Sequence, residues 1–457
     1  MTFPLPYDRF RWMTEEELAA FDPEKHGGED DDPDGGEGYI LEVDLEYPEH
    51  LHLDHHSFPL APEQIEVTEQ DLSPYAQNVL REMVGRGEHS ASASATTKRK
   101  CAEKGSSFLP RHRARKLTST FNRRIEYAVH SANLKYYIRA GMKLLRIRRG
   151  VAFRQRRFIA PYVEMCTRKR QMSKTKAESN IFKLLINSLY GKMIESNDKK
   201  MDCRFNFHEI QAEKRFRCPT LKGTVICGDD FSVSFHRKRE VAMGQSWAVG
   251  FGILERSKLI MQKLFYDVIR PAFRNRVTML MSDTDSFCML VEDTDVDSAV
   301  RKLSPVMDFS NYPPDHELYD ASNKNVLGLL KNEVPGSSCI KRFAGVKAKS
   351  YMVVTAEEEE IMAKAKGVKT CMKKHLRFAD YKRVILGAES HRVTQYGLLA
   401  KDYVNRLVRS TKVAFSSLYD QRYLLCAIHT CPYGSRLIRL AAQNNNCPLC
   451  ANPSLLL

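Results

Sequence analysis

The stretch Met279-Leu-Met-Ser-Asp283-Thr-Asp285-Ser286-Phe-Cys-Met-Leu-Val291 carries two carboxylates one residue apart, between two apolar runs. This pattern predicts a β-hairpin with both aspartates at its tip. Because side chains alternate along a strand, Asp283 and Asp285 should point to the same side, where both can reach a hard divalent cation. Such a pair suits two-metal phosphoryl transfer. An ordinary aspartate-rich turn is the alternative for the short D-T-D sequence, and the flanking apolar strands favour the metal site.

A second pattern lies upstream, in Lys183-Leu-Leu-Ile-Asn187-Ser-Leu-Tyr190-Gly191-Lys192, and predicts a helix. Lys183, Asn187 and either Tyr190 or Gly191 are spaced i, i+4 and i+7 or i+8, so they share one helical face. That face offers an ammonium group for a triphosphate, an amide, and an aromatic ring beside a glycine that lets a base approach. Simple packing is the alternative role for the tyrosine.

The opposite face of this helix carries Leu185 and Leu189 and is predicted to enter the core. Upstream of the helix, Arg170 belongs to a basic cluster, and a guanidinium can hold phosphate through two hydrogen bonds. The helix is therefore interpreted as a phosphate-binding element.

The charge is divided unevenly along the 457 residues, whose formal net charge is +15. Residues 1–72 carry a net −18, whereas residues 98–176 carry +21. A block that basic indicates a polyanionic partner such as nucleic acid, because neutralised phosphates release counterions. A solvated helical face is the alternative, but so few acids would leave strong self-repulsion without a partner.

Composition excludes several classes of protein. Hydrophobic residues make up 43% of the chain, which is typical of a folded protein. No apolar run reaches the roughly 18 residues that span a bilayer, so no membrane partner is expected. The 12 cysteines are scattered, which indicates reduced intracellular thiols rather than a disulfide framework.

Periodicity predicts the coarse organisation of the chain. Apolar residues recur at near-helical spacing from Leu117 to Met193, for example at Leu144 and Ile147. Alternation predicts a strand over 39–45 and short strands within 202–235, and a helix is expected from about Leu254 to Val268. Segment 27–38 is predicted to be an acidic loop, and 85–112 a low-complexity linker or insertion.

Three ordered motifs resemble those of family B DNA polymerases. The hairpin at Asp283 is similar to the catalytic DTDS motif of the palm, and the Lys183 helix is similar to the K-x-x-x-N-S-x-Y-G fingers helix. Phe343-Ala-Gly-Val-Lys347-Ala-Lys349-Ser-Tyr351 is similar to the K-x-Y element that holds the primer-template duplex. Their order and separation agree with the family.

Other segments resemble the protein-primed branch, particularly the polymerases of Maverick/Polinton transposons and related viruses. These segments are GYILEVDLEYPEHLH (38–52), SFPLAPE (57–63), YAVHSANLKYYIRAG (127–141), GFGILERSKLIM (250–261), KAKGVKTCMKK (364–374) and KVAFSSLYDQRYLL (412–425). The resemblance covers almost the whole chain except the 85–112 insertion and the extreme C-terminus.

The resemblance implies an α+β fold of right-hand polymerase architecture, with an antiparallel palm sheet, helical fingers and a mixed α/β thumb. The implied divisions are a partial palm at 1–84, the linker at 85–112, basic fingers helices at 113–200, palm with the catalytic hairpin at 201–344, a thumb at 345–436 and a tail at 437–457.

The resemblance also implies roles for individual residues. Asp283 and Asp285 would bind two Mg²⁺ ions, or Mn²⁺. The residues that would contact the incoming deoxynucleoside triphosphate are Arg170, Lys183, Asn187, Tyr190 and Gly191. Those that would contact DNA are Lys347, Lys349, Tyr351, Lys412 and Arg422. The implied partners are primer-template DNA, deoxynucleoside triphosphates and a priming terminal protein, at a nuclear or viral replication site.

One family motif, D-x-x-x-L-Y, supplies a further metal-binding aspartate and is missing here. The resemblance implies that this chain begins just after it and also lacks the exonuclease region. Asp44, in Asp44-Leu-Glu-Tyr47, is the substitute that the sequence offers, but its spacing to the tyrosine is too short. Two readings follow: a DNA-directed DNA polymerase, or a DNA-binding remnant of a transposon or virus without catalysis. A two-metal nuclease is a third, and it leaves the Lys183 helix unexplained.

The C-terminal region contains Cys447-Pro-Leu-Cys450, which has the spacing of a zinc knuckle. Cys431 with either Cys426 or His429 would complete four ligands. Zinc sites usually contain two tight pairs, so a single pair favours ordinary surface thiols over structural zinc. The histidines of segment 50–56 are likewise predicted to be solvated.

Overall fold

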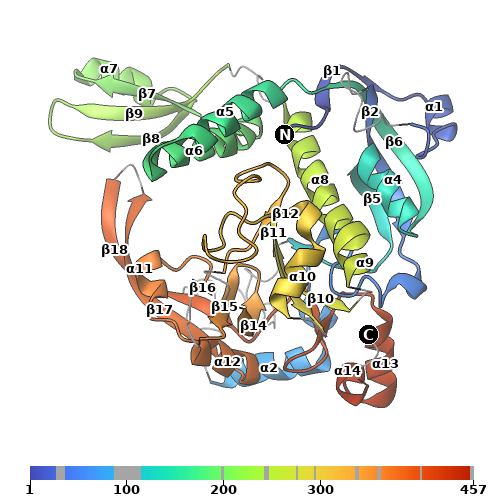
Figure 1. Cartoon of the computed structure of the whole chain (residues 1–457). Coiled ribbons are helices and arrows are strands. Elements are labelled where there is room, and N and C mark those ends of the chain that lie inside the picture. Colours follow the sequence, from blue (N-terminus) through green and yellow to red (C-terminus); the bar gives the residue numbers. More distant parts are fainter. Residues whose placement is uncertain are drawn as a thin grey trace. The chain divides into compact units, whose positions relative to one another are not determined.

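The structure is a computed structural model (Figure 1). It describes residues 1–26, 36–86, 115–196, 200–240, 246–273, 276–292, 295–334, 339–357, 362–401 and 404–452. Most of the predicted acidic loop at 27–38 and of the linker at 85–112 therefore lies outside the described residues. By its internal contacts the chain divides into two compact units. The first comprises Met1–Pro161, Leu254–Val393 and Thr411–Leu457, and the second comprises Tyr162–Ile253 and Thr394–Ser410.

The first unit contains a four-stranded antiparallel sheet (Figure 1). Its strand order is β1 (Leu5–Trp12), β6 (Lys143–Arg156), β2 (Glu37–Glu46) and β5 (Arg124–His130). The predicted strand at 39–45 is confirmed as β2. Tyr39, Leu41, Val43 and Leu45 alternate along it and are all buried, because one face of the sheet meets the core.

The prediction of helical structure from Leu117 to Met193 is confirmed at Ser131–Arg139 and from Ala160 onward, and it is wrong for the strands in its first half. Leu144 and Ile147 lie on strand β6, opposite Leu45 and Val43 of β2. Four residues of β6 therefore lie opposite three of β2, and the register shift is a β-bulge. Because of the extra residue, Leu144 and Ile147 are three positions apart in sequence instead of two, which is a spacing typical of a helix.

Helices cover this sheet within the first unit. Helix α4 (Ser131–Arg139) packs on β2 and β5 through Leu134 and Tyr137. Helix α8 (Trp247–Lys263) contributes Leu259 to the same core. Its chain continues as a π-helical turn and then as α9 (Arg270–Ala272), so the predicted helix is confirmed. The helical backbone runs on through Pro271, so an interruption before this proline is wrong.

The hairpin predicted around Asp283 is confirmed as strands β10 (Val277–Asp283) and β11 (Ser286–Val291). Val277 and Met279 pack into a core that also holds Phe265 and residues of α10 (Val296–Lys302). Nearby strands β12 (Met307–Asp308) and β13 (Leu330–Lys331) pair in parallel.

A three-stranded antiparallel sheet follows, formed by β14 (Ile340–Lys347), β15 (Ser350–Thr355) and β16 (Met362–Lys364). The amphipathic helix α12 (Phe378–Leu386) packs on it through Tyr381 and Val384. The remaining elements that follow are α11 (Thr370–Lys373) and the long paired strands β17 (Ser390–Lys401) and β18 (Val404–Ser416).

The second unit contains helices α5 (Ala160–Met172) and α6 (Lys176–Met193) and a small antiparallel sheet. The sheet has the order β7 (Met201–Asn206), β9 (Ser232–Arg237) and β8 (Leu221–Ile226), which confirms the strands predicted within 202–235. Helix α7 (Glu209–Phe216), between the first two strands in sequence, was not predicted.

The C-terminal segment folds against residues 49–56 of the first unit, called here the early segment. It consists of β19 (Tyr423–Leu424), β20 (Thr430–Cys431), α13 (Arg436–Asn444) and α14 (Pro448–Ala451). The backbone amide of Arg436 donates to His52 Nδ1 at 3.2 Å.

Other small elements of this unit are α1 (Glu15–Ala19), β3 (Glu63–Ile65), α2 (Pro74–Gly85) and β4 (Lys116–Thr118).

This packing shows that the prediction of solvated histidines is wrong for His52, His55 and His56, which are buried. Burial lowers the pKa of His55 to about 4 and that of His56 to about 3. His52 and His56 are bonded to the C-terminal segment, whereas the ring of His55 packs on Tyr47 and Tyr266.

The fold is thus α+β with mainly antiparallel sheets, as the sequence predicts at this coarse level. None of the helices in the described ranges is long and apolar enough to cross a membrane.

Candidate active site

The tip of the β10–β11 hairpin presents both predicted metal ligands. Asp283 pairs with Ser286 at the last rung, so Thr284 and Asp285 form the turn. The amide of Asp285 donates to the carbonyl of Asp283 at 2.7 Å, and the Ser286 hydroxyl donates to the same carbonyl at 3.1 Å. Both aspartates therefore sit at a turn whose backbone is held by its own hydrogen bonds.

The backbone at Thr284 is strained. Its φ is +61°, in the left-handed region that a β-branched residue rarely adopts. The short hydrogen bond across it, from Asp285 to Asp283, is that of a tight three-residue turn. Strain of this kind concentrates at functional sites, where the rest of the fold holds it in place.

A second hairpin brings a lysine to this turn. Lys349 lies in the β14–β15 turn, with φ of +59°. Its ammonium Nζ lies 2.5 Å and 2.7 Å from the two carboxylate oxygens of Asp283. The structure therefore joins the K-x-Y element to the aspartate hairpin, across 66 residues of sequence.

The other members of the K-x-Y element are less exposed. Tyr351 is only 8% exposed, and its ring lies 5.9 Å from that of Phe343. Burial, together with the charge of Asp283, raises the pKa of its phenol. Lys347 is half-buried and pairs with Ser350 at the end of the sheet.

Asp44 lies in strand β2 and is 4% exposed. The guanidinium of Arg148 donates to both of its oxygens, at 2.9 Å and 3.0 Å, and the amide of Glu126 donates to Oδ1 at 3.0 Å. These bonds, that to Arg148 first, lower the pKa of the Asp44 carboxyl. The Asp44 carboxylate, which the sequence offered as a third metal ligand, is therefore hydrogen-bonded within the sheet.

Two carboxylates at an open turn fit Mg²⁺ or Mn²⁺, which prefer oxygen ligands and keep several waters. No third carboxylate joins them among the described residues. In the described ranges, the one group of three or more potential metal ligands within 4.8 Å of one another contains neither Asp283 nor Asp285.

The helix predicted around Lys183 is confirmed as α6, which Thr175 caps at its N-terminus, and its nucleotide-binding role stays a prediction. Lys183 and Asn187 are exposed on it, and Tyr190 is half-buried, which raises the pKa of its phenol. A Cβ at Gly191 would meet no described atom within 4 Å, so the space around this glycine is open.

The predicted burial of the opposite face of α6 is wrong. Among the described residues of this helix none is buried, and Leu185 is 39% exposed while Leu189 is half-buried. Ile181 and Leu184 are 57% and 67% exposed. An apolar stripe shows that a helix has a face to cover, but it does not show whether the chain itself supplies the cover.

The remaining predicted residues have different surroundings. Arg170, on α5, is half-buried, and Lys412, on β18, is exposed. Arg422 is half-buried instead and donates to Thr430 Oγ1 at 2.9 Å and to the carbonyl of His56 at 3.1 Å. Burial lowers the pKa of this guanidinium. Its contacts assign Arg422 to the internal packing of the C-terminal segment.

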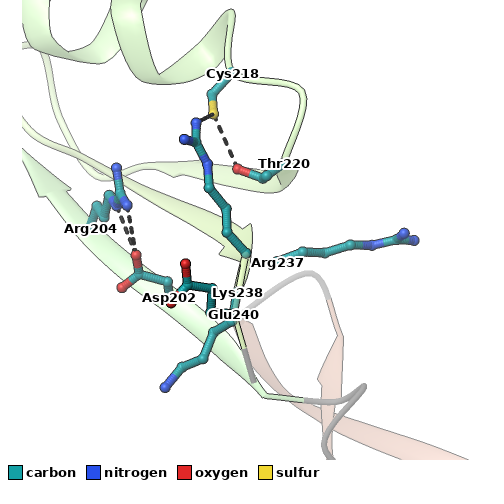
Figure 2. A pocket seen from close by; sticks show the side chains of 8 residues that line it. Asp202, Arg204, Cys218, Thr220, Arg237, Lys238 and Glu240 are labelled. Carbon is teal, nitrogen blue, oxygen red and sulfur yellow. Dashed lines mark hydrogen bonds and ion pairs between the residues drawn. The ribbon is translucent and has the colours of Figure 1, made fainter. Parts of the chain in front are cut away.

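Sequence reasoning missed a polar pocket in the second unit, of about 340 Å³ (Figure 2). It is lined by Asp202, Arg204, Cys218, Thr220, Arg237, Lys238, Arg239 and Glu240. Hydrogen bonds from Thr220, and then one from Arg239, lower the pKa of Cys218 to about 7. None of these residues belongs to the three motifs, and no sequence pattern marks them.

A family model matches residues 89–208, and its description is "DNA polymerase type B, organellar and viral". The matched segment contains helix α6 and Arg170, whereas the two hairpins lie outside it. No curated protein matches the chain.

Two solved structures of Phi29 DNA polymerase are similar to the chain, one with primer-template DNA and one with primer-template DNA and incoming nucleotide substrates. Both show 13% identity and a TM-score of 0.46, and the matches cover 90% of this chain and 54% and 55% of those chains. The chain thus spans about half the length of these proteins. Through residues 89–208 it is similar to the type B DNA polymerases of organelles and viruses, which are DNA-directed nucleotidyltransferases.

Proposed function

We propose that the chain is the polymerase part of a protein-primed family B DNA polymerase of transposon or viral origin. In this reaction the 3′ hydroxyl of a primer, or a hydroxyl of a priming protein, attacks the α-phosphate of a deoxynucleoside triphosphate and releases pyrophosphate. The observation that carries the proposal is the contact of Lys349 with Asp283, because it unites two of the three sequence motifs in one place. The third motif lies in the segment that matches the family model.

Asp283 and Asp285 would hold the divalent cations, which lower the pKa of the attacking hydroxyl and stabilise the leaving oxygen. The strained turn at Thr284 would limit the relative orientation of the two carboxylates before the cations bind. Lys349 forms an ion pair with Asp283. When DNA and cations bind, the lysine would leave this carboxylate and contact a phosphate of the primer-template duplex instead.

Helix α6 would bind the incoming nucleotide. Lys183 and Arg170 supply positive charge for the triphosphate, and Asn187 is exposed beside the lysine on the same face. Tyr190 and Gly191 end that face with a ring and an open space, which suits a nascent base pair. Lys347, Tyr351 and Lys412 would act with Lys349 on the duplex.

A second candidate function, DNA binding without catalysis, is favoured by Asp44. Its carboxylate is bonded to Arg148 and to the Glu126 amide, and no further carboxylate joins the hairpin among the described residues. Two ligands without a third should hold the cations weakly, which would lower the rate by orders of magnitude.

A primer-extension assay with Mg²⁺ and deoxynucleotides tests the proposal, together with DNA binding measured by fluorescence anisotropy. The key variant is Asp285→Ala, and its matched control is Asp230→Ala, which removes an exposed carboxylate of the second unit. Extension that is lost in the first variant and kept in the second supports the polymerase. Binding without extension supports the second candidate, and degradation of unprimed DNA would replace both with a nuclease.

A further inference from the structure

Four side chains converge in the C-terminal segment of the first unit. They are Cys426, His429, Cys447 and Cys450, and their ligand atoms all lie within 4.8 Å of one another. None of them belongs to the three polymerase motifs, and the proposed function does not use them.

The distances between these atoms are those of a tetrahedral metal site. Cys426 Sγ lies 3.8 Å from Cys450 Sγ. His429 Nδ1 lies 3.4 Å, 3.6 Å and 3.3 Å from the sulfurs of Cys426, Cys447 and Cys450. Bond lengths of about 2.3 Å for Zn–S and about 2.0–2.1 Å for Zn–N place tetrahedral ligands about 3.8 Å apart for two sulfurs and about 3.5 Å apart for sulfur and nitrogen.

Local backbone structure presents the ligands as two tight pairs. Cys426 and His429 close the turn between β19 and β20, where the amides of Leu425 and Cys426 donate to the His429 carbonyl at 2.9 Å and 3.3 Å. Cys447 precedes helix α14, and the amide of Cys450 donates back to its carbonyl at 3.1 Å. The pattern is therefore C-x₂-H followed by C-x₂-C, a combination typical of structural zinc sites.

The surroundings are those of a small fold that needs a cross-link. The cluster of buried residues here is limited to Cys431, Leu437, Cys447 and Leu449 among the described residues. Strands β19 and β20 have two residues each and α14 has four, while α13 and α14 are in contact (Figure 1). So few apolar residues rarely hold such short elements without a metal or a disulfide.

We propose that Cys426, His429, Cys447 and Cys450 bind one Zn²⁺ ion in a closed structural site that clamps the β19–β20 turn to helix α14. Three thiolates and one imidazole favour zinc over the hard cations that carboxylates bind. Cys431, which the sequence suggested as a ligand, is fully buried beside the group and is not a member of it.

The site would also support the first unit as a whole. Helix α13, enclosed between the two ligand pairs, contacts the early segment through the ion pair of Arg439 with Glu49 and the bond of Arg436 to His52. By holding both ends of the stretch that contains α13, zinc would stabilise the packing of this helix on Glu49 and the buried His52.

The test is the zinc content of the full-length protein, purified under reducing conditions and measured by mass spectrometry of the metal. We expect one zinc per chain in the wild type and close to none in Cys450→Ser, whose side chain is exposed. Cys227→Ser, at another exposed cysteine outside the group, should keep one zinc per chain. His429→Cys, which preserves a zinc ligand, should keep the metal and shows that loss in Cys450→Ser is not simply misfolding.

Cobalt supplies a second readout. Co²⁺ exchanged into the wild type should give the absorption bands of tetrahedral thiolate coordination, and these should be lost in Cys450→Ser. Zinc bound equally by the wild type and Cys450→Ser would overturn the proposal, as would a wild-type protein that binds no zinc. Neither readout depends on primer extension, so failure here is distinct from failure of the proposed polymerase activity.

Discussion

Lys349 and Asp283 meet from two separate hairpins, and each hairpin holds its residue at or beside a turn with positive φ. An ammonium group bonded to both oxygens of a carboxylate competes with any cation that needs the same oxygens. The contact is partly exposed, at 58% for the lysine and 31% for the aspartate, so its free energy is small.

Lys349→Met should therefore raise the affinity of the hairpin for Mn²⁺ by up to about fivefold, because an exposed ion pair contributes at most about 1 kcal/mol. Electron paramagnetic resonance of free Mn²⁺ measures this affinity in the absence of DNA. Lys412→Met is the control and should leave the affinity unchanged. A weaker affinity in Lys349→Met would mean that the lysine orients the aspartate rather than competing for it.

His130 is one of the buried histidines that contribute to the acid stability of the first unit. It is fully buried at the end of β5, and its Nδ1 accepts a hydrogen bond from the Ala132 amide at the start of α4. Burial lowers its pKa to about 3, against about 6.5 in an unfolded chain. Between these values the unfolded chain binds a proton that the folded chain does not, so stability falls as the pH drops below about 6.5.

In His130→Asn this dependence should weaken by about 1.4 kcal/mol per pH unit between about pH 6 and 5, because asparagine keeps the helix cap and does not titrate. Urea unfolding at several pH values measures the free energy of unfolding. His208→Asn changes an exposed histidine before α7 that makes no capping bond, and it should keep the wild-type slope. Equal slopes in all three proteins would contradict the assignment.

At the scale of elements, β6 explains most of what the sequence could and could not predict. Alternation identified β2, because this strand buries one face along most of its length. It failed at β6, because a bulge there breaks the period of two between Leu144 and Ile147. Sequence periodicity predicts which side of a strand is buried only where no bulge shifts the pairing of that strand with its neighbour.

The candidate site shows the same limit. Sequence motifs predicted Asp283, Lys349 and helix α6, but no local pattern could show that Asp44 is bonded to Arg148, 104 residues away. The sequence also named Cys447, Cys450 and either Cys426 or His429, but it favoured surface thiols over the zinc site that we propose, for a simpler reason. Cys426-Ala-Ile-His429 is itself a tight pair, and counting it beside Cys447-Pro-Leu-Cys450 would have given the usual two.

Strand β6 also contains a glycine that the sheet requires. A Cβ at Gly150 would lie 2.5 Å from Met13 Sδ and 2.7 Å from Leu41 Cδ2, and Leu41 is fully buried. Gly150→Ala should lower the free energy of unfolding by about 1–3 kcal/mol, as overpacking of a core does.

Urea denaturation checks this loss against Gly85→Ala, a control at the end of helix α2 where a Cβ meets no described atom within 4 Å. The control should leave stability unchanged or raise it by up to about 1 kcal/mol, because alanine favours a helix. A Gly150→Ala protein as stable as the control would show that Met13 and Leu41 can move aside.

For the whole molecule, the basic block at 98–176 dominates the expected interaction with nucleic acid. Its described part includes Arg168 and Lys169, which are exposed on α5. Each phosphate contact changes the slope of log affinity against log salt by about 0.9 for duplex DNA.

The double variant Arg168→Ala, Lys169→Ala should therefore weaken duplex binding at low salt and reduce that slope by about 2. Fluorescence anisotropy between about 50 and 200 mM salt measures both quantities. The matched control is Lys374→Ala, Lys382→Ala, which removes two exposed lysines near α12. If both double variants lost the same slope, the charge of the whole chain rather than this block would hold the DNA.

The packing of the C-terminal segment on residues 49–56 has a consequence for the order of events during synthesis. His52 and Arg436 are 384 residues apart, and His56 and Arg422 are 366 apart. At about 5–20 residues per second, a ribosome needs on the order of 20–80 s to travel between them. Throughout that interval the partly made chain must keep His52, His56 and their apolar neighbours from binding other partners, which makes residues 49–56 a natural client for chaperones.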